Sequence, residues 1–239
     1  MKPWLLALAA GAALCASLPH QEADEYRNER LLMVRQQLAS RLGGRSPVTD
    51  AEVLRAMETV PRHRFVRPGD VDRAYSDRPL PIGHGQTISQ PYIVAAMTEM
   101  LGVEPGDVVL EIGTGSGYQA AVLAELTDSV YTIEVVEPLG LDAAARLAGL
   151  GYGKVRTLVG DGYFGWPDHP PFDGILVTAA ASHIPPPLVE QLKRGARMVI
   201  PVGGPFQVQS LMLVEKQHDG SVIQWNMGAV RFVPLTRSE

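Results

Sequence analysis

Residues 108–119 constrain the fold more than any other part of the chain. Residues 108–112 are apolar apart from Glu111, which is typical of a strand buried on both faces of a parallel sheet. Gly113, Gly115 and Gly117 follow at once, and residues 120–126 have the composition of a helix. A strand, a glycine turn and a helix N-terminus together let bare backbone approach a ligand closely. The stretch therefore predicts a cofactor site.

The same alternation of strand and helix continues toward the C-terminus. We expect further strands at residues 130–134, 155–159, 174–178 and 197–201, and a helix at residues 142–150. Two more strands, at residues 210–216 and from 222 or later to 233, follow without a helix between them and turn at Asp219-Gly220. The chain is thus predicted to be an α/β protein. Its Rossmann-like, doubly wound, seven-stranded sheet would be mostly parallel, with an antiparallel hairpin at one edge.

Helices are expected before this sheet, at about residues 25–60. The first, over residues 26–42, places four apolar side chains near one face: Leu31, Val34, Leu38 and Leu42. The second would start at Thr49, with Glu52 completing a capping box, and run to Pro61. We expect both to pack against the sheet or to form an N-terminal subdomain. Since no linker or repeat interrupts residues 18–239, they are predicted to form a single domain.

Residues 61–91 are rich in proline and glycine and show no obvious element of their own. Long irregular connections are usually functional or disordered, and the apolar residues here argue for function. The segment ends at a helix expected over residues 92–101, with Pro91 in its first turn and Thr87 or Ser89 as its cap. The N-terminus of this helix could bind a carboxylate of a ligand. The alternative is that Thr87 and Ser89 serve only as helix caps.

The first 17 residues have the layout of a secretory signal peptide. Lys2 precedes an uncharged, apolar run at residues 4–16, and cleavage is expected near Ala16 or Ser17. The alternative is an apolar N-terminal extension.

Composition limits the other classes of function. A net charge of -5 and a pI of about 5.7 give no basic footprint for nucleic acid. Cys15 is the one cysteine, so neither an intramolecular disulfide nor a cysteine metal site is expected. The histidines lack the spacing of metal ligands, and His84 is expected to be structural. We therefore predict no metal and no stable membrane association.

Acidic residues at the strand ends indicate which cofactor binds. Glu134 ends the second strand about 20 residues beyond the first glycine, where an acid accepts the ribose hydroxyls of an adenosine. Asp161 and Gly162 end the third strand, where a carboxylate or an amide could meet the adenine amino group. The third glycine comes too early for a dinucleotide fingerprint, and the P-loop lysine is absent. Glu111 would repel a pyrophosphate but suits the ammonium of S-adenosylmethionine, which the pattern favours.

A family resemblance makes this assignment specific. Residues 111–120 look like the first motif of seven-stranded, class I S-adenosylmethionine-dependent methyltransferases. The chain resembles the protein-L-isoaspartate(D-aspartate) O-methyltransferase family from about Leu31 to Thr236, in that motif and in residues 85–91, 159–162, 179–181, 192–203 and 233–236. The segment at residues 85–91 is the most distinctive of these.

The resemblance implies a protein repair reaction. A methyl group would pass from S-adenosylmethionine to the free α-carboxylate of L-isoaspartyl residues in damaged proteins or peptides, leaving S-adenosyl-L-homocysteine. The ester would close to a succinimide, whose hydrolysis returns some normal aspartate.

The resemblance also assigns residues to roles. It implies Ser89 as the active-site residue and a substrate group of Thr87, Ile88, Gln90, Pro91 and Thr236. The cofactor group, which also rests on the spacing above, is Glu111, Gly113, Thr114, Gly115, Ser116, Gly117, Glu134, Asp161 and Gly162. Two departures from the family pattern are Tyr163 and Arg67.

The implied chemistry needs few groups. A peptide α-carboxylate has a pKa of about 3.3 to 3.7, so it is ionised at neutral pH and needs no general base. Holding the two reacting groups in the right geometry can by itself lower the activation barrier by about 7 to 11 kcal/mol. We therefore expect Ser89 to orient the carboxylate through its hydroxyl and the helix N-terminus, without acting as a nucleophile. Two alternatives stay open: a methyltransferase of the same fold acting on another carboxylate or a small molecule, and a non-catalytic cofactor-binding module.

The expected compartment follows from the methyl donor. S-adenosylmethionine is made in the cytosol, so a cytoplasmic protein is expected. The protein is also expected to be a monomer. The signal-like residues 1–17 favour a periplasmic or secreted protein instead.

Overall fold

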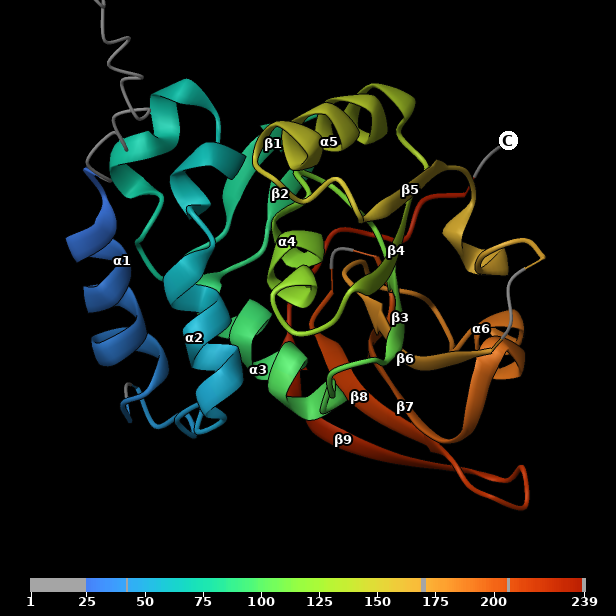
Figure 1. The fold of residues 1–239 in the computed structure, drawn as a ribbon. Helices are drawn as coiled ribbons and strands as arrows, with labels where there is room; N and C mark the ends of the chain where they lie inside the picture. Colours follow the sequence, from blue (N-terminus) through green and yellow to red (C-terminus); the bar gives the residue numbers. More distant parts are fainter. Residues whose placement is uncertain (1–24, 42, 169–170, 206, 238–239) are drawn as a thin grey trace, which may run out of the picture.

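A seven-stranded sheet forms the centre of the computed structural model, which describes residues 25–41, 43–168, 171–205 and 207–237 (Figure 1). Its strand order is β5-β4-β3-β6-β7-β8-β9. The bounds are β3 (Val108–Ile112), β4 (Ser129–Glu134), β5 (Arg156–Val159), β6 (Phe172–Val177), β7 (Leu192–Val202), β8 (Gln209–Lys216) and β9 (Val222–Val230). Strands β3 to β7 are parallel, and β8 is antiparallel to both β7 and β9. The predicted fold class is confirmed. The candidate signal peptide at residues 1–17 lies outside the described residues.

Helices lie on both faces of the sheet because its central strands are apolar on both sides. Val109, Leu176 and Val199 belong to the core beneath α3 (Pro91–Leu101) and α4 (Tyr118–Ala124). Leu110 and Ile175 point the other way, into a second core that includes Leu188 of α6 (Pro186–Gln191). Side chains alternate between faces along a strand, so a buried parallel strand must be apolar throughout. Helix α5 (Glu137–Gly149) connects β4 to β5.

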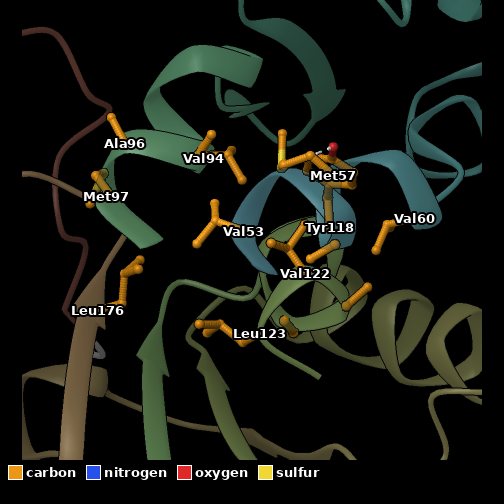
Figure 2. Packing of buried hydrophobic residues seen from close by; sticks show 14 of the residues in the cluster. Val53, Met57, Val60, Val94, Ala96, Met97, Tyr118, Val122, Leu123 and Leu176 are labelled. Atoms are coloured by element: carbon orange, nitrogen blue, oxygen red, sulfur yellow. Dashed lines mark hydrogen bonds between the residues drawn. The ribbon is translucent and has the colours of Figure 1, made fainter. Parts of the chain in front are cut away.

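The N-terminal helices pack mainly on other helices. Helix α1 (Arg27–Met33) continues into the π-helical turn η1 (Val34–Leu38), and α2 (Ala51–Thr59) follows. Figure 1 shows α1 on the outer side of α2, away from the sheet. In Figure 2, α2 meets α3 and α4 through Val53, Met57, Val60, Val94, Tyr118 and Val122, whereas Met97 lies on the side of α3 toward Leu176. Val34 and Leu38 are buried as expected, whereas Leu31 is only half-buried; Leu42 lies outside the described residues. The same core therefore continues from the sheet to the N-terminal helices.

The cap of α2 differs from the prediction by one residue. The Asp50 carboxylate accepts hydrogen bonds from the Glu52 and Val53 amides at 2.8 and 3.1 Å. The expected cap, Thr49, instead donates its amide and hydroxyl to Glu99 of α3, at 2.6 and 3.1 Å. Glu99 thus draws Thr49 into a contact between helices, and the cap moves to the next residue.

The prediction that residues 61–91 lack elements of their own is wrong. The segment holds the 3₁₀ turns η2 (Arg62–Phe65) and η3 (Pro68–Arg73) and an antiparallel hairpin of β1 (Leu80–Gly83) and β2 (Gln86–Ile88). Leu80 pairs with Ile88, and both side chains are buried. The hairpin is short and β1 contains Pro81, which is tolerated only at a strand edge, so the strand pattern is hard to see in the sequence.

In the part of the chain that the structure describes, no helix is long and apolar enough to cross a membrane.

Candidate functional site

A pocket lies at the carboxyl ends of β3, β4 and β6, where the connections of the sheet change direction. From β3 the chain moves outward to β4 and β5, then returns to place β6 on the other side of β3. Ligands of doubly wound sheets bind at such a point. The lining includes residues 111–116 at the end of β3 and in the turn after it, residues 133–136 at the end of β4, Gly162, Thr178 and Ala179. Most of the residues predicted to bind the cofactor are therefore gathered in one place.

The glycine turn after β3 is held rigidly by backbone hydrogen bonds. The Gly113 and Thr114 amides both donate to the Ile133 carbonyl, at 2.8 and 3.1 Å. The Gly117 amide donates to the Thr114 carbonyl at 2.8 Å, and Arg146 of α5 donates to the Ser116 carbonyl at 2.8 Å. Gly117 packs at the start of α4 and does not line the pocket. The turn is thus fixed before any ligand arrives.

The Glu134 carboxylate is oriented by two backbone amides at the end of β4. It accepts a hydrogen bond from the Gly115 amide at 2.7 Å and another from the Val136 amide at 3.0 Å. The side chain is buried and lines the pocket. Its position at the end of the second parallel strand is the one predicted for a ribose-binding acid.

Glu111 is a fully buried carboxyl with an unused oxygen in the pocket wall. One oxygen accepts a hydrogen bond from the Thr132 hydroxyl at 2.6 Å, and Thr132 in turn lies 2.7 Å from the Thr114 hydroxyl. The other oxygen, Oε1, is buried without a partner among the described residues. Burial raises the pKa of Glu111 to about 8, and the nearby Glu134 adds to the effect. A buried acid with a free oxygen fits a ligand that brings a positive charge.

Glu111→Gln is expected to flatten the pH dependence of stability. The pKa of Glu111 is about 8 in the folded protein against an ordinary value of 4.5, so the folded state holds the proton more tightly. The free energy of unfolding therefore falls as the pH rises from about 4.5 to about 8, and this fall disappears in the variant. Urea unfolding of both proteins at several pH values in this window measures the difference. The exposed Glu104→Gln is the control; an equal pH slope in wild type and Glu111→Gln would contradict the buried-acid assignment.

The predicted substrate residues divide between the pocket and its surroundings. Thr87, Ile88 and Ser89 line the pocket, whereas Gln90 lines an adjoining groove and Pro91 is buried at the start of α3.

Neither Thr87 nor Ser89 caps α3, contrary to prediction. The position before the helix is Gln90, which makes no capping bond of its own. Asp77 instead accepts from the Tyr92 amide at 3.0 Å and from the Gln90 side chain at 2.9 Å. A carboxylate from a distant segment thus occupies the helix N-terminus, and neither hydroxyl is used to cap the helix.

Arg62 anchors the segment that carries Ser89, a role that no sequence pattern indicates. Its guanidinium donates to the Ser89 carbonyl at 2.7 Å and to the Ala74 carbonyl at 2.8 Å, and it lies over the Tyr118 ring at 4.8 Å. The side chain is completely buried, and burial lowers the pKa of its guanidinium. Arg62 therefore ties the Ser89 backbone to α4.

The carboxylate of Asp161 is engaged by its own surroundings. It accepts from the Tyr163 amide at 3.0 Å and from Arg237 at 2.7 Å, and Asp161 does not line the pocket, although Gly162 does. Arg237 also lies over the Tyr163 ring at 3.9 Å. Tyr163, one of the two departures from the family pattern, thus supports the C-terminal segment. The other departure, Arg67, is exposed and lines neither the pocket nor the groove.

The C-terminal segment reaches the pocket by pairing with the chain after β6. The Ala180 amide donates to the Val233 carbonyl, and the Leu235 amide donates to the Ala180 carbonyl, both at 2.8 Å. This pairing places residues 233–236 in the pocket wall, including the predicted substrate residue Thr236.

Thr178 is a pocket residue that sequence reasoning missed. Its hydroxyl donates to the Ile112 and Gly113 carbonyls at 2.9 and 2.6 Å, and the residue lines both the pocket and the groove. The available signal was its position at the end of the strand predicted over residues 174–178, where ligand contacts of parallel sheets gather.

Over the described ranges, no cluster of three or more His, Cys, Asp or Glu side chains has the arrangement of a metal site.

Known proteins match the chain over almost its whole length. The family model described as Protein-L-isoaspartate(D-aspartate) O-methyltransferase (PCMT) matches residues 33–239. Protein-L-isoaspartate O-methyltransferase 1 of Nitrosospira multiformis is 59% identical over 233 residues, which cover 97% of this chain and 98% of the relative. The enzyme of the same name from Cupriavidus necator is 54% identical over 240 residues, covering 98% and 92%.

Solved structures agree with these sequence matches. A structure described as a protein-L-isoaspartate O-methyltransferase has a TM-score of 0.76 and 27% identity, covering 87% of this chain and 65% of that chain. A Plasmodium falciparum protein assigned to the same type of enzyme was solved in complex with S-adenosyl-L-homocysteine. It has a TM-score of 0.70 and 25% identity, covering 80% of this chain and 93% of that chain. The chain therefore belongs to the protein-L-isoaspartate(D-aspartate) O-methyltransferase family.

Proposed function

We propose that this chain transfers a methyl group from S-adenosylmethionine to the free α-carboxylate of L-isoaspartyl residues in damaged proteins and peptides. The observation that carries the proposal is that the glycine turn and the Ser89 segment, far apart in the sequence, line one pocket. Family membership over residues 33–239 supports the same reaction.

The donor fits the charges and the backbone of this pocket. The sulfonium of S-adenosylmethionine supplies an activated methyl group when the donor is bound. Glu134 would accept the ribose hydroxyls, since two amides already orient its carboxylate. The unused oxygen of Glu111 would receive the ammonium group, and the Gly162 backbone would lie near the adenine. The Plasmodium falciparum relative, which holds the corresponding product, supports this assignment.

The enzyme has to position the acceptor carboxylate but does not have to remove a proton from it. The α-carboxylate of the acceptor is already ionised at neutral pH, because its pKa is about 3.3 to 3.7. The Ser89 hydroxyl would donate a hydrogen bond to this carboxylate and align it with the methyl carbon. The amide of Tyr92 is taken by Asp77, so we assign the orienting role to the hydroxyl and no longer to the helix N-terminus.

Ser89→Ala is expected to lower kcat by about 10²-fold, the usual effect of removing one donor from a reacting group. The KM for S-adenosylmethionine should stay unchanged, since the glycine turn and Glu134 remain. Steady-state kinetics on an isoaspartyl peptide measure both constants, and the exposed Ser46→Ala is the matched control. Wild-type kcat in Ser89→Ala would remove the orienting role, and a methylated Ser89 seen by mass spectrometry would replace it with covalent catalysis.

Paired peptides that differ only as Asp or isoAsp test the function. With S-adenosylmethionine labelled in its methyl group, base-labile label is expected on the isoAsp peptide alone. Label on both peptides, or on neither, would favour a methyltransferase with another acceptor or a non-catalytic cofactor-binding module.

The donor also bears on the compartment. Since S-adenosylmethionine is made in the cytosol, we propose that the enzyme acts in the cytoplasm. Cell fractionation with N-terminal sequencing tests this, and an exported protein beginning near Leu18 would contradict it.

A further inference from the structure

A groove beside the donor pocket opens into it at Ser89. The two share Thr87, Ser89, Thr178 and Val233, and the groove has a volume of about 450 Å³. Binding sites for small ligands usually measure about 300 to 1,000 Å³. The groove is therefore large enough for a short stretch of polypeptide, and it begins where the reacting carboxylate would lie.

Two separate parts of the chain form the walls. Pro79 and Gln90 come from the segment that leads into α3, and Ile93 comes from α3 itself. On the other side, Val208 lies just before β8 and Val230 ends β9. The lining is mostly apolar, and Val208 is 57% exposed. Such walls suit the side chains and backbone of an extended peptide.

Arg231 is the one charged residue among the described residues that line the groove. The side chain is exposed, and it makes no hydrogen bond or ion pair with any residue the structure describes. Two other arginines around the pocket are committed to partners: Arg62 to the Ser89 and Ala74 carbonyls, and Arg237 to Asp161. A guanidinium left unpaired beside an apolar groove is suited to a carboxylate, which it can bind through two parallel hydrogen bonds.

We propose that the groove binds the polypeptide segment adjoining the isoaspartyl residue, and that Arg231 favours an acidic side chain in that segment. The inference rests on the proposed function, because the occupant must continue from the residue held at Ser89. The net charge of -5 makes a local positive group more important, since an acidic substrate would otherwise be repelled. Arg231 would thus set sequence preference, while the shared residues hold the reacting group.

Peptides with one isoaspartyl residue and a Glu, Gln or Lys at each neighbouring position test this inference. For a neighbouring position on one side of the isoaspartyl residue, the wild-type kcat/KM is expected to be about two- to fivefold higher for the Glu peptide than for the Lys peptide. The difference should lie in KM and not in kcat. Arg231→Gln should lose this preference, Arg231→Lys should keep part of it, and about 1 M salt should suppress it. The exposed Arg35→Gln, which removes the same charge from η1, should behave as wild type.

Two results would overturn the inference: equal kcat/KM for the Glu and Lys peptides in wild type, or a preference that persists in Arg231→Gln. Methylation of isoaspartyl peptides without charge preference overturns this inference and leaves the proposed function intact. Failure to methylate any isoaspartyl peptide removes the proposed function itself.

Discussion

Arg62→Met is expected to lower the free energy of unfolding by about 2 to 4 kcal/mol. The substitution removes the donor to the Ser89 and Ala74 carbonyls, and an unsatisfied buried group costs about 1 to 3 kcal/mol. Because methionine is uncharged, the variant no longer buries a cation, and this gain in stability offsets part of the cost. The kcat should also fall by about tenfold or more, since a small misplacement at a reacting centre has large effects. Urea unfolding and steady-state kinetics measure the two changes.

Arg64 provides the control for Arg62. It lies two residues away on η2, and its side chain is exposed. Arg64→Met should change stability by no more than about 0.5 kcal/mol and leave kcat unaltered. If Arg62→Met is as stable and as active as Arg64→Met, then Arg62 does not anchor the Ser89 segment.

Gly113→Ala should destabilise the protein by about 3 to 5 kcal/mol and weaken donor binding more than tenfold. Gly113 has φ of 98°, where an L side chain is strained, and an added Cβ would lie 2.4 Å from the Thr178 hydroxyl oxygen. Strain of this kind costs about 1 to 3 kcal/mol, and overpacking adds a similar amount. The hydroxyl also donates to the Gly113 carbonyl, so a shift that relieves the clash would disturb the turn. Calorimetric titration with S-adenosyl-L-homocysteine and urea unfolding report the two effects.

Gly106→Ala is the control for Gly113→Ala, because it introduces the same kind of backbone strain without a steric clash. Gly106 has φ of 95°, but nothing lies within 4 Å of an added Cβ. Gly106→Ala should therefore cost about 1 to 2 kcal/mol and leave donor binding unchanged. Equal losses in the two variants would show that the contact with Thr178 has no part in holding the turn.

The sheet and the gathering of residues at its strand ends could be predicted because both depend on short-range patterns. A parallel strand buried on both faces must be apolar throughout, as Val108–Ile112 is apart from Glu111. Ligand contacts gather at the carboxyl ends of such strands, and this rule predicts that Glu134 and Gly162 lie in the pocket, as they do. Thr178 obeys the same rule and could have been included.

The contacts that the sequence could not reveal join segments that are distant along the chain. Asp77 reaches the start of α3, Arg62 reaches Ser89, and Arg237 reaches Asp161. Each depends on how the segments fold back on one another, and a single arginine or aspartate carries no local mark of such a partner. The fine geometry of the Ser89 segment is therefore a product of tertiary packing.

Three peptides of one sequence test the central claim most directly. One contains Asp, the second isoAsp, and the third isoAsp with its α-carboxylate converted to an amide. Incubated with methyl-labelled S-adenosylmethionine, only the second should acquire label, the label should be base-labile, and the peptide should go on to yield some of the Asp form. Label on the amide peptide, or equal label on the Asp peptide, would contradict transfer to the α-carboxylate of isoaspartate.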